Sequence, residues 1–231
     1  MARDTRPNGD VWVVVPVFNE QSVLEAVIGE ILATFPNVVC VDDGSSDGSA
    51  SAVAATGAHL VRHPVNLGQG AALQTGLTYA RARAGAQYFV TFDADGQHRL
   101  EDAVRMLELA RSGAADVVLG SRFLEHADTV PWLKRAVLRI AAAADPAARR
   151  LKLTDAHNGL RVLTRPVVDH LNIRMNRMAH ASEIVSYLAN SPWRVVEVPV
   201  SILYTEYSKA KGQSLVNGVN ILFDLSIRQR G

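Results

Sequence analysis

The amino-acid sequence predicts an α/β fold in which helices flank an open, mostly parallel β-sheet. In the first half of the 231-residue chain, short apolar runs alternate with segments whose apolar residues recur at helical spacing. Polar, mostly acidic clusters follow three of these runs, at Phe18–Glu20, Asp42–Asp43 and Asp93–Asp95. Because ligands bind outside the carboxyl ends of parallel strands, we expect the three clusters to meet at one edge of the sheet.

The strands of the first half are expected where the sequence is apolar, often valine-rich, and bounded by polar residues. Their expected ranges, in order, are Val11–Val17, Val38–Val41, His59–Arg62, Tyr88–Phe92 and Asp116–Leu119.

The helices between these strands are expected from apolar residues three or four positions apart. In Glu20–Phe35 the pattern includes Val23, Val27 and Ile31, and Ser22 is a candidate N-cap. The other expected helices are Gly48–Thr56, the alanine-rich Gly70–Ala84, and Leu100–Ser112.

The pattern changes after Arg122. Trp132–Leu151 is rich in alanine, arginine and lysine and is expected to be helical, with an interruption at Pro146. Val195–Leu203 alternates in part, as a strand does. Tyr204–Ser214 is a polar loop with lysines, and a final helix is expected at Leu215–Arg228.

Composition limits the classes of function. We expect a flexible N-terminus at residues 1–10 and one domain over residues 11–231. A net charge of +1 gives no strong field for nucleic acid binding. Cys40 is the only cysteine, which excludes an intramolecular disulfide and favours a reducing, cytoplasmic setting. The longest apolar candidate, Val216–Ile227, is broken by polar residues, so membrane contact is expected to be peripheral at most.

The pair Asp93 and Asp95 is the strongest candidate for chemistry. Strand alternation would point both carboxylates to one side, where Mg²⁺ or Mn²⁺ could bind, and Gln97 and His98 could extend the site. An isolated Asp-X-Asp is more often a solvated turn. The apolar run before Asp93 favours the metal site instead.

Two further clusters could serve both the fold and the binding of a ligand. In the turn Asp42–Gly48 we expect Asp47 to cap the next helix and Asp43 to contact ligand. The segment Asn66–Gly70 contains Gly-X-Gly, which suits either close approach to a diphosphate or simple helix initiation.

Basic residues are concentrated in the second half of the chain. A solvated helix face is the ordinary explanation, while the apolar side of the segment from Trp132 onward equally favours a basic amphipathic helix on an anionic membrane surface. The residues are Arg122, Lys134, Arg135, Arg139, Arg149, Arg150, Lys152, Arg161 and Arg165.

The ordered motifs resemble family 2 glycosyltransferases, in particular the dolichyl-phosphate mannose synthase-like branch. The resemblance covers nearly the whole chain from Val11 and continues through Gly120–Arg122. Its motifs are Val15–Glu20, Val41–Gly48, Asn66–Ala72, Phe92–His98 and Thr154–Arg161.

The resemblance implies a GT-A fold, inverting transfer, and a nucleotide-sugar site. The nucleoside would be held by Pro16, Phe18, Glu20 and Asp43. A divalent metal, Mg²⁺ or Mn²⁺, would be held by Asp93, Asp95 and Gln97, with Asp93 also serving the nucleotide-sugar and Asp95 acting in catalysis.

The resemblance also implies an acceptor site. Arg122 and Arg135 match positions that bind a lipid phosphate and act in catalysis, and Arg139 would extend this patch. Lys209 and Lys211 would assist the departing nucleoside diphosphate. The chain departs from the family pattern here, because Lys209 stands where an arginine is common and Leu215 where a lysine is common.

We therefore expect a transferase that moves a hexose from a UDP- or GDP-sugar to a polyprenyl phosphate at the inner face of the cell membrane. The alternatives are a soluble or surface-glycan acceptor, and a non-catalytic nucleotide-sugar-binding partner. Homo-oligomerisation through the Leu215 helix is a further alternative to its packing within the chain.

Overall fold

The computed structural model describes residues 6–124, 145–176 and 179–203. The strands are β1 (Val11–Val17), β2 (Val38–Asp42), β3 (His59–Arg62), β4 (Tyr88–Thr91), β5 (Val117–Ser121), β6 (Arg161–Thr164) and β7 (Val195–Pro199). The helices are α1 (Gln21–Thr34), α2 (Ser49–Ala54), α3 (Gln69–Arg81), α4 (Leu100–Arg111), α6 (Pro146–Arg150), α7 (Arg165–His170) and α8 (Ala179–Ala189).

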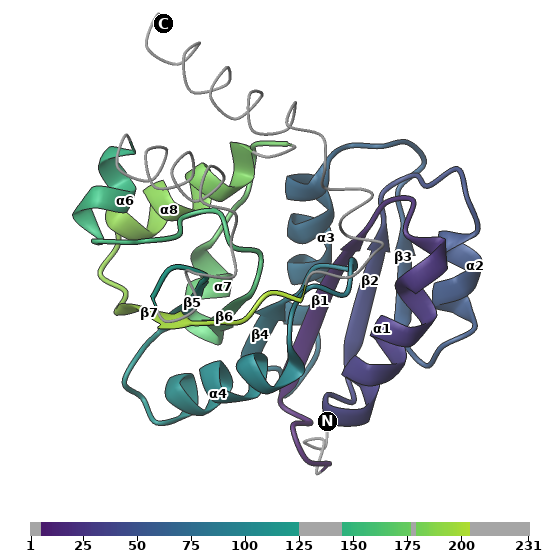
Figure 1. Ribbon diagram of the computed structural model, residues 1–231, viewed down its shortest axis with the longest axis horizontal. Coiled ribbons are helices and arrows are strands. Elements are labelled where there is room, and N and C mark those ends of the chain that lie inside the picture. Colours follow the sequence, from purple (N-terminus) through teal and green to yellow (C-terminus); the bar gives the residue numbers. More distant parts are fainter. Residues whose placement is uncertain (1–5, 125–144, 177–178, 204–231) are drawn as a thin grey trace, which may run out of the picture.

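The strands form one mostly parallel sheet in the order β3-β2-β1-β4-β6-β5-β7 (Figure 1). Only β6, among the described strands, runs antiparallel, to both β4 and β5. The carboxyl ends of the six parallel strands therefore share one edge with the amino end of β6. This edge is called the carboxyl edge below.

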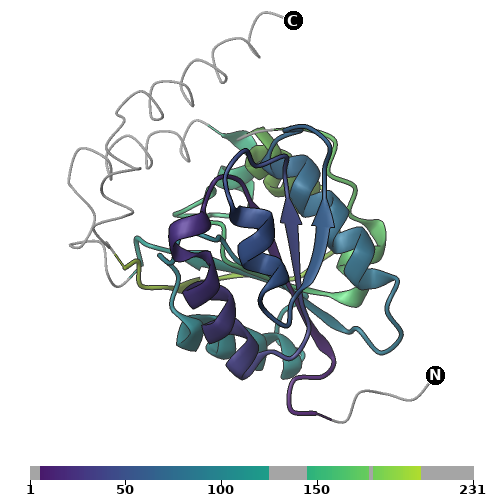
Figure 2. The same cartoon turned by 90° about the vertical axis from the view of Figure 1, so that its right-hand side faces the viewer.

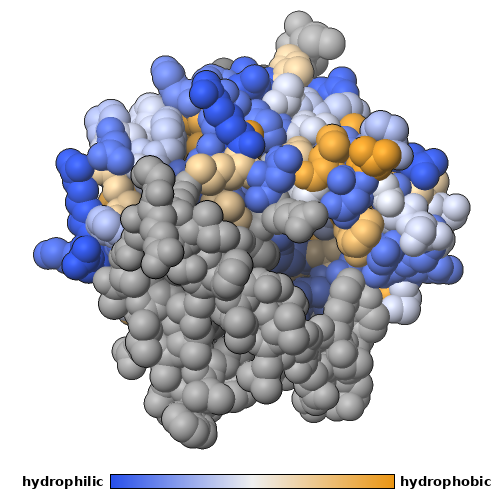
Figure 3. Space-filling view, turned by 90° about the horizontal axis from the view of Figure 1, so that it is seen from above, coloured by the Kyte–Doolittle hydropathy of each residue, from blue (hydrophilic) through white to orange (hydrophobic). Residues whose placement is uncertain are grey.

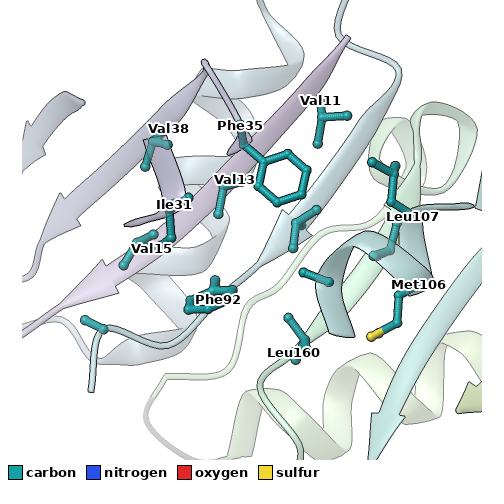
Figure 4. Packing of buried hydrophobic residues seen from close by; sticks show 14 of the residues in the cluster. Val11, Val13, Val15, Ile31, Phe35, Val38, Phe92, Met106, Leu107 and Leu160 are labelled. Carbon is teal, nitrogen blue, oxygen red and sulfur yellow. The ribbon is translucent and has the colours of Figure 1, made fainter. Parts of the chain in front are cut away.

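Helices cover both faces of the sheet, and side-chain alternation along β1 explains how (Figure 2). Val11, Val13 and Val15 pack in the core with α1 and α4, whereas Trp12 and Val14 pack on the opposite face with α3, α7 and α8. Figure 4 shows Val11, Val13 and Val15 facing Ile31 and Phe35. Each fully buried side chain of this size stabilises the fold by roughly 1.5–3 kcal/mol.

The five strands expected in the first half are confirmed, with ends shifted by at most two residues. One local expectation is wrong: Ser22 is not the N-cap of α1, because Glu20 occupies that position and makes no side-chain cap hydrogen bond. Pro146 begins α6, and Asp145 accepts hydrogen bonds from the amides of Ala147 and Ala148. Residues 132–144 of the helix expected at Trp132–Leu151 lie outside the described residues.

The described part of the N-terminal segment is attached to the domain. Asn8 donates a hydrogen bond to the Thr34 carbonyl, and Arg111 donates to both Asn8 and Asp10. These contacts tie residues 8 and 10 to the domain, and the expected flexible N-terminus stays a prediction.

No helix within the described ranges has both the length and the hydropathy needed to cross a membrane. The expected helix at Leu215–Arg228, and with it the oligomer contact, lies outside the described residues.

Candidate functional site

The turn after β1 is fixed to the turn after β2 at the carboxyl edge. The Asn19 amide donates to Ser45 Oγ (3.0 Å), and the Glu20 amide donates to Ser49 Oγ (2.9 Å). Asn19 adopts a left-handed backbone with φ of 54°, which lets its side chain accept from the Ser46 amide. Pro16 and Phe18 lie beside this junction, at the end of β1 and just after it.

Asp47 has the structural role expected from the sequence. Its carboxylate accepts hydrogen bonds from the Ser49 amide and hydroxyl, at 2.9 and 2.6 Å, and from the Gln21 amide at 3.2 Å. These contacts lower the pKa of Asp47 despite the opposing cost of burial. Asp47 thus connects the starts of α1 and α2.

Asp43 forms a buried clamp on the loop between β3 and α3. Its carboxylate accepts from the amides of Leu67 (2.9 Å) and Gly68 (2.7 Å), and it lies 2.7 Å from His63 Nδ1. His63 Nε2 in turn lies 3.0 Å from Thr75 Oγ1 on α3. Gly68 has a positive φ of 97°, which suits glycine at this start of α3.

A cavity of about 390 Å³ lies beside the clamp. It is open to solvent and has size enough for a nucleobase. Its lining residues are Gly44, Ser45, Arg62, His63 and Pro64.

Asp93 and Asp95 lie in the turn after β4, not in the strand itself. Strand alternation is therefore the wrong reason for their proximity, although the two carboxylates do interact. Asp93 is bound by Gln69 Nε2 at 3.1 Å and by His98 Nε2 at 3.0 Å. The Gly159 Cα lies so close that a Cβ there would overlap the Asp93 carboxylate.

The two carboxylates are placed in different electrostatic environments. Burial would raise the pKa of Asp93, but the hydrogen bond and charge of His98, with the charge of Arg161, lower it overall. The pKa of Asp95 is raised by burial and then by the charge of Asp93, against a 3.0 Å hydrogen bond from the Gln97 amide. A cation beside Asp95 would relieve this repulsion.

Arg161 differs from the expectation of a solvated basic residue. It is 2% exposed at the first position of β6. Burial lowers its pKa, while Asp93 and Asp155 raise it. Within the described residues its Nη1 atom has no hydrogen-bond partner. Antiparallel β6 was not expected, and only that direction brings Arg161 to the carboxyl edge.

Arg122 lies just after β5 and forms a bidentate ion pair with Asp155. The Nε–Oδ2 and Nη2–Oδ1 distances are 2.6 and 2.7 Å, and the Arg122 amide also donates to Asp155 Oδ2. Burial opposes ionisation of Asp155, but Arg122 lowers its pKa overall. The Arg122 side chain as a whole is 16% exposed.

The part of the chain that is described contains no group of three His, Cys, Asp or Glu side chains placed to hold a metal ion. Four predicted site residues, Arg135, Arg139, Lys209 and Lys211, lie outside the described residues. The others, Pro16, Phe18, Glu20, Asp43, Asp93, Asp95, Gln97 and Arg122, all lie at or next to the carboxyl edge.

This arrangement defines the class as a GT-A-type nucleotide-binding α/β protein. Solved structures of that fold are similar to the chain. Glucosyl-3-phosphoglycerate synthase from Mycobacterium tuberculosis, in complex with Mn²⁺ and UDP, gives a TM-score of 0.61 at 17% identity, over 90% of this chain and 78% of that one. Mannosyl-3-phosphoglycerate synthase from Rubrobacter xylanophilus gives a TM-score of 0.62 at 17% identity. The match covers 96% of this chain and 76% of that one.

The family follows from the sequence match. The model of glycosyl transferase family 2 matches residues 12–171, and the chain belongs to this family and is a glycosyltransferase. An uncharacterised protein from Methanocaldococcus jannaschii is 30% identical over 95% of this chain and 92% of its own length.

Two named relatives also match along most of their length. UDP-N-acetylglucosamine–dolichyl-phosphate N-acetylglucosaminyltransferase from Methanococcus voltae is 26% identical over 96% of both chains. Polyprenol monophosphomannose synthase from Mycolicibacterium smegmatis is 28% identical over 94% of this chain and 84% of its own.

Proposed function

We propose that this enzyme transfers a hexose, with inversion, from a nucleotide-sugar to a polyprenyl phosphate, assisted by a divalent metal ion. The observation that carries the proposal is the arrangement of charge at the carboxyl edge. The acidic pair Asp93 and Asp95 follows β4, and Arg122 follows β5, with only β6 between these strands. The diphosphate, held through the metal ion, would thus lie on one side of the reaction centre, and the anionic acceptor would lie on the other side.

The nucleotide end of the substrate fits the other half of the edge. The cavity lined by Gly44, Ser45 and His63 would accept the base, with Pro16, Phe18 and Glu20 alongside. Asp43 would act there by holding the loop that forms the cavity wall.

The acidic turn suits a hard divalent cation. Mg²⁺ and Mn²⁺ prefer carboxylate oxygens, and substrate phosphates often complete their coordination. Asp93, oriented by His98 and Gln69, and Asp95 would hold the ion, with Gln97 beside them. When bound, the ion supplies Lewis-acid stabilisation of the diphosphate.

The acceptor half needs binding and orientation more than proton transfer. A lipid phosphate is already anionic, so it can attack the sugar carbon without a general base. The Arg122 side chain is partly exposed, its guanidinium suits a phosphate oxygen, and Asp155 fixes the plane of this group. Arg135 and Arg139 are proposed to extend this patch.

Peripheral membrane contact at the inner face of the membrane is part of the proposal. The large exposed apolar side chains of the described residues all follow carboxyl ends of strands. Seen onto this edge, the molecule carries hydrophobic residues among hydrophilic ones (Figure 3). Placed against a bilayer interface, they would bring the site to a lipid phosphate. The residues are Phe18, Val65, Leu67, Leu124 and Leu203.

Calorimetry and product analysis test the function. UDP- and GDP-hexoses are titrated with Mn²⁺ and with chelator, and the bound nucleotide-sugar is then offered polyprenyl phosphate in vesicles or free sugars. We expect metal-dependent binding of one nucleotide and glycosylation of the lipid phosphate. Glycosylation of a free sugar with no lipid product would reject polyprenyl phosphate as the acceptor.

Asp95→Asn tests the metal role. Loss of the Asp95 carboxylate is expected to lower kcat by about 10²–10³-fold, as for loss of a group that stabilises transition-state charge. Asp169→Asn is the matched control, because Asp169 forms an exposed ion pair with Arg165 on α7. Unchanged activity in Asp95→Asn would exclude Asp95 from catalysis.

A further inference from the structure

Glu197 on β7 makes an unusually dense set of contacts with a segment that no helix or strand contains. Its carboxylate accepts four hydrogen bonds, all from Thr154 and Asp155. Oε1 accepts from the amides of Thr154 (3.0 Å) and Asp155 (2.8 Å). Oε2 accepts from the Thr154 amide and hydroxyl, both at 2.8 Å.

The segment that Glu197 holds carries the partner of Arg122. Asp155 is 3% exposed and pairs with Arg122 through two side-chain hydrogen bonds and one from the backbone. Thr154 Oγ1 also lies 2.6 Å from Ser121 Oγ, at the end of β5. The position of the 154–155 backbone therefore sets the plane of the Arg122 guanidinium.

Glu197 can hold this backbone accurately because β7 is a direct neighbour of β5. Glu197 is in register with Leu119, and Pro199 with Ser121, so the carboxylate is anchored on the strand beside Arg122. A carboxylate accepts stronger hydrogen bonds from amide groups than a neutral oxygen does. Without the Glu197 carboxylate, the amides of Thr154 and Asp155 would lose the group that accepts their hydrogen bonds.

We infer that Glu197 is a positioning residue for the acceptor phosphate: through Thr154 and Asp155 it fixes the orientation in which Arg122 meets that phosphate. This inference rests on the proposed function, in which Arg122 binds the acceptor. In the proposed function the nucleotide-sugar is bound elsewhere, at the turns after β1, β2 and β4.

The test uses Glu197→Gln in the full chain, with Asp116→Asn as matched control. Glutamine keeps the size of the side chain but offers one oxygen and an amide donor to groups that need acceptors. Asp116 makes a similar clamp at the opposite end of the same strand pair, since it accepts from the Arg194 amide, Nε and Nη2.

In steady-state assays with polyprenyl phosphate in vesicles, Glu197→Gln is expected to raise the acceptor KM about tenfold. The calorimetric Kd of the nucleotide-sugar should change less than about twofold, and Asp116→Asn should change neither. An unchanged acceptor KM, or an equal loss of nucleotide-sugar affinity, would overturn the inference.

A second readout does not depend on turnover. The ¹⁵Nε–¹H signal of Arg122, assigned from its loss in Arg122→Lys, reports the hydrogen bond to Asp155. We expect its proton exchange to be faster in Glu197→Gln and unchanged in Asp116→Asn. Unaltered exchange in Glu197→Gln would refute the positioning role, whereas absent lipid glycosylation by the unmodified enzyme would refute only the proposed function.

Thr154→Val covers the case in which Glu197→Gln does not fold. Valine keeps the three backbone hydrogen bonds to Glu197 and removes only the hydroxyl contacts with Glu197 and Ser121. A smaller rise in acceptor KM, with faster Arg122 exchange, supports the inference. No change in either measurement contradicts it.

Discussion

At the scale of single residues, the site depends on carboxylates whose hydrogen bonds are already made by protein groups. Asp93 is oriented by Gln69 and His98, and Asp155 by Arg122. Ordered side chains of this kind are suited to catalysis, because orientation is fixed before substrate binds. Small changes next to them should therefore have large effects.

Gly159→Ala is expected to displace the Asp93 carboxylate, because the new Cβ would overlap it. We expect kcat to fall about 100-fold, as for a misplacement of roughly 1 Å near the reacting centre. Steady-state kinetics and urea unfolding are the measurements.

Gly29→Ala is the control for this substitution. Gly29 lies in α1 with no heavy atom near the added Cβ, so the change should stabilise the protein by about 0.5–1 kcal/mol and leave kcat unchanged. An active Gly159→Ala enzyme would show that Asp93 need not keep this position.

Asp155→Asn should destabilise the protein in a pH-dependent way. The pKa of Asp155 is lowered in the folded state, so its stabilising contribution is present above the ordinary value of 3.8 and is lost as pH falls through the folded pKa. We expect a loss of roughly 1–3 kcal/mol at pH 7. The difference in urea midpoint between the two proteins should shrink towards pH 3, and a constant difference would contradict the ion pair.

At the scale of elements, the loops after strands carry the site, and side chains from neighbouring elements fix them. Asp43 just after β2, His63 after β3 and Thr75 in α3 form one chain of hydrogen bonds around the loop at residues 63–68. This loop borders the proposed base cavity, so its rigidity should matter for nucleotide affinity.

Asp43→Asn is expected to loosen that loop. Hydrogen exchange at the amides of Leu67 and Gly68 should accelerate, because asparagine offers only one oxygen in place of the two that now accept from them. Nucleotide-sugar affinity should fall in parallel.

Asp47→Asn is the comparison for this experiment. Asp47 accepts from Gln21 and Ser49, so its loss should speed exchange at those amides and leave residues 67–68 unchanged. Equal exchange at Leu67 in all three proteins would mean that Asp43 does not restrain the loop.

The sequence predicts well the strands that follow an apolar run. It does not predict a strand that lacks such a run. Strands β1 to β5 follow apolar runs, and the acidic turns after β2 and β4 lie at the expected edge. Strand β6 has only four residues and begins with Arg161, so neither alternation nor an apolar run signals it. Its antiparallel direction, and the burial of Arg161, depend on partners distant in sequence.

The same limit applies to the acceptor half of the site. Arg122 was expected there by resemblance, but its pairing with Asp155 and the clamp from Glu197 join segments more than 30 residues apart. Spacing along the chain carries no signal for such contacts. Contacts of this kind emerge only when the sheet order is known.

At the scale of the whole molecule, one continuous sheet joins the nucleotide half to the acceptor half. Cys40 lies in β2 between β1 and β3, is 0% exposed, and has a pKa raised by burial. A thiol in this state is unreactive until the surrounding structure opens.

Labelling of Cys40 by a thiol reagent should therefore report opening of the sheet core. We expect the labelling rate to rise with urea with the same dependence as global unfolding measured by circular dichroism. A rate that is insensitive to low urea would instead reveal a local opening of β2.

The burial of Arg161 between two carboxylates has a consequence for how this enzyme can change over evolution. Asp93, Arg161, Asp155 and Arg122 alternate in charge, and Arg161 interacts with one carboxylate from each half of the site, Asp93 and Asp155. Substitutions in such a series are not additive. A variant that acquires a new sugar preference by altering Asp93 would leave Arg161 underbalanced and alter acceptor use as well, so specificity for the two substrates is expected to diverge through paired substitutions.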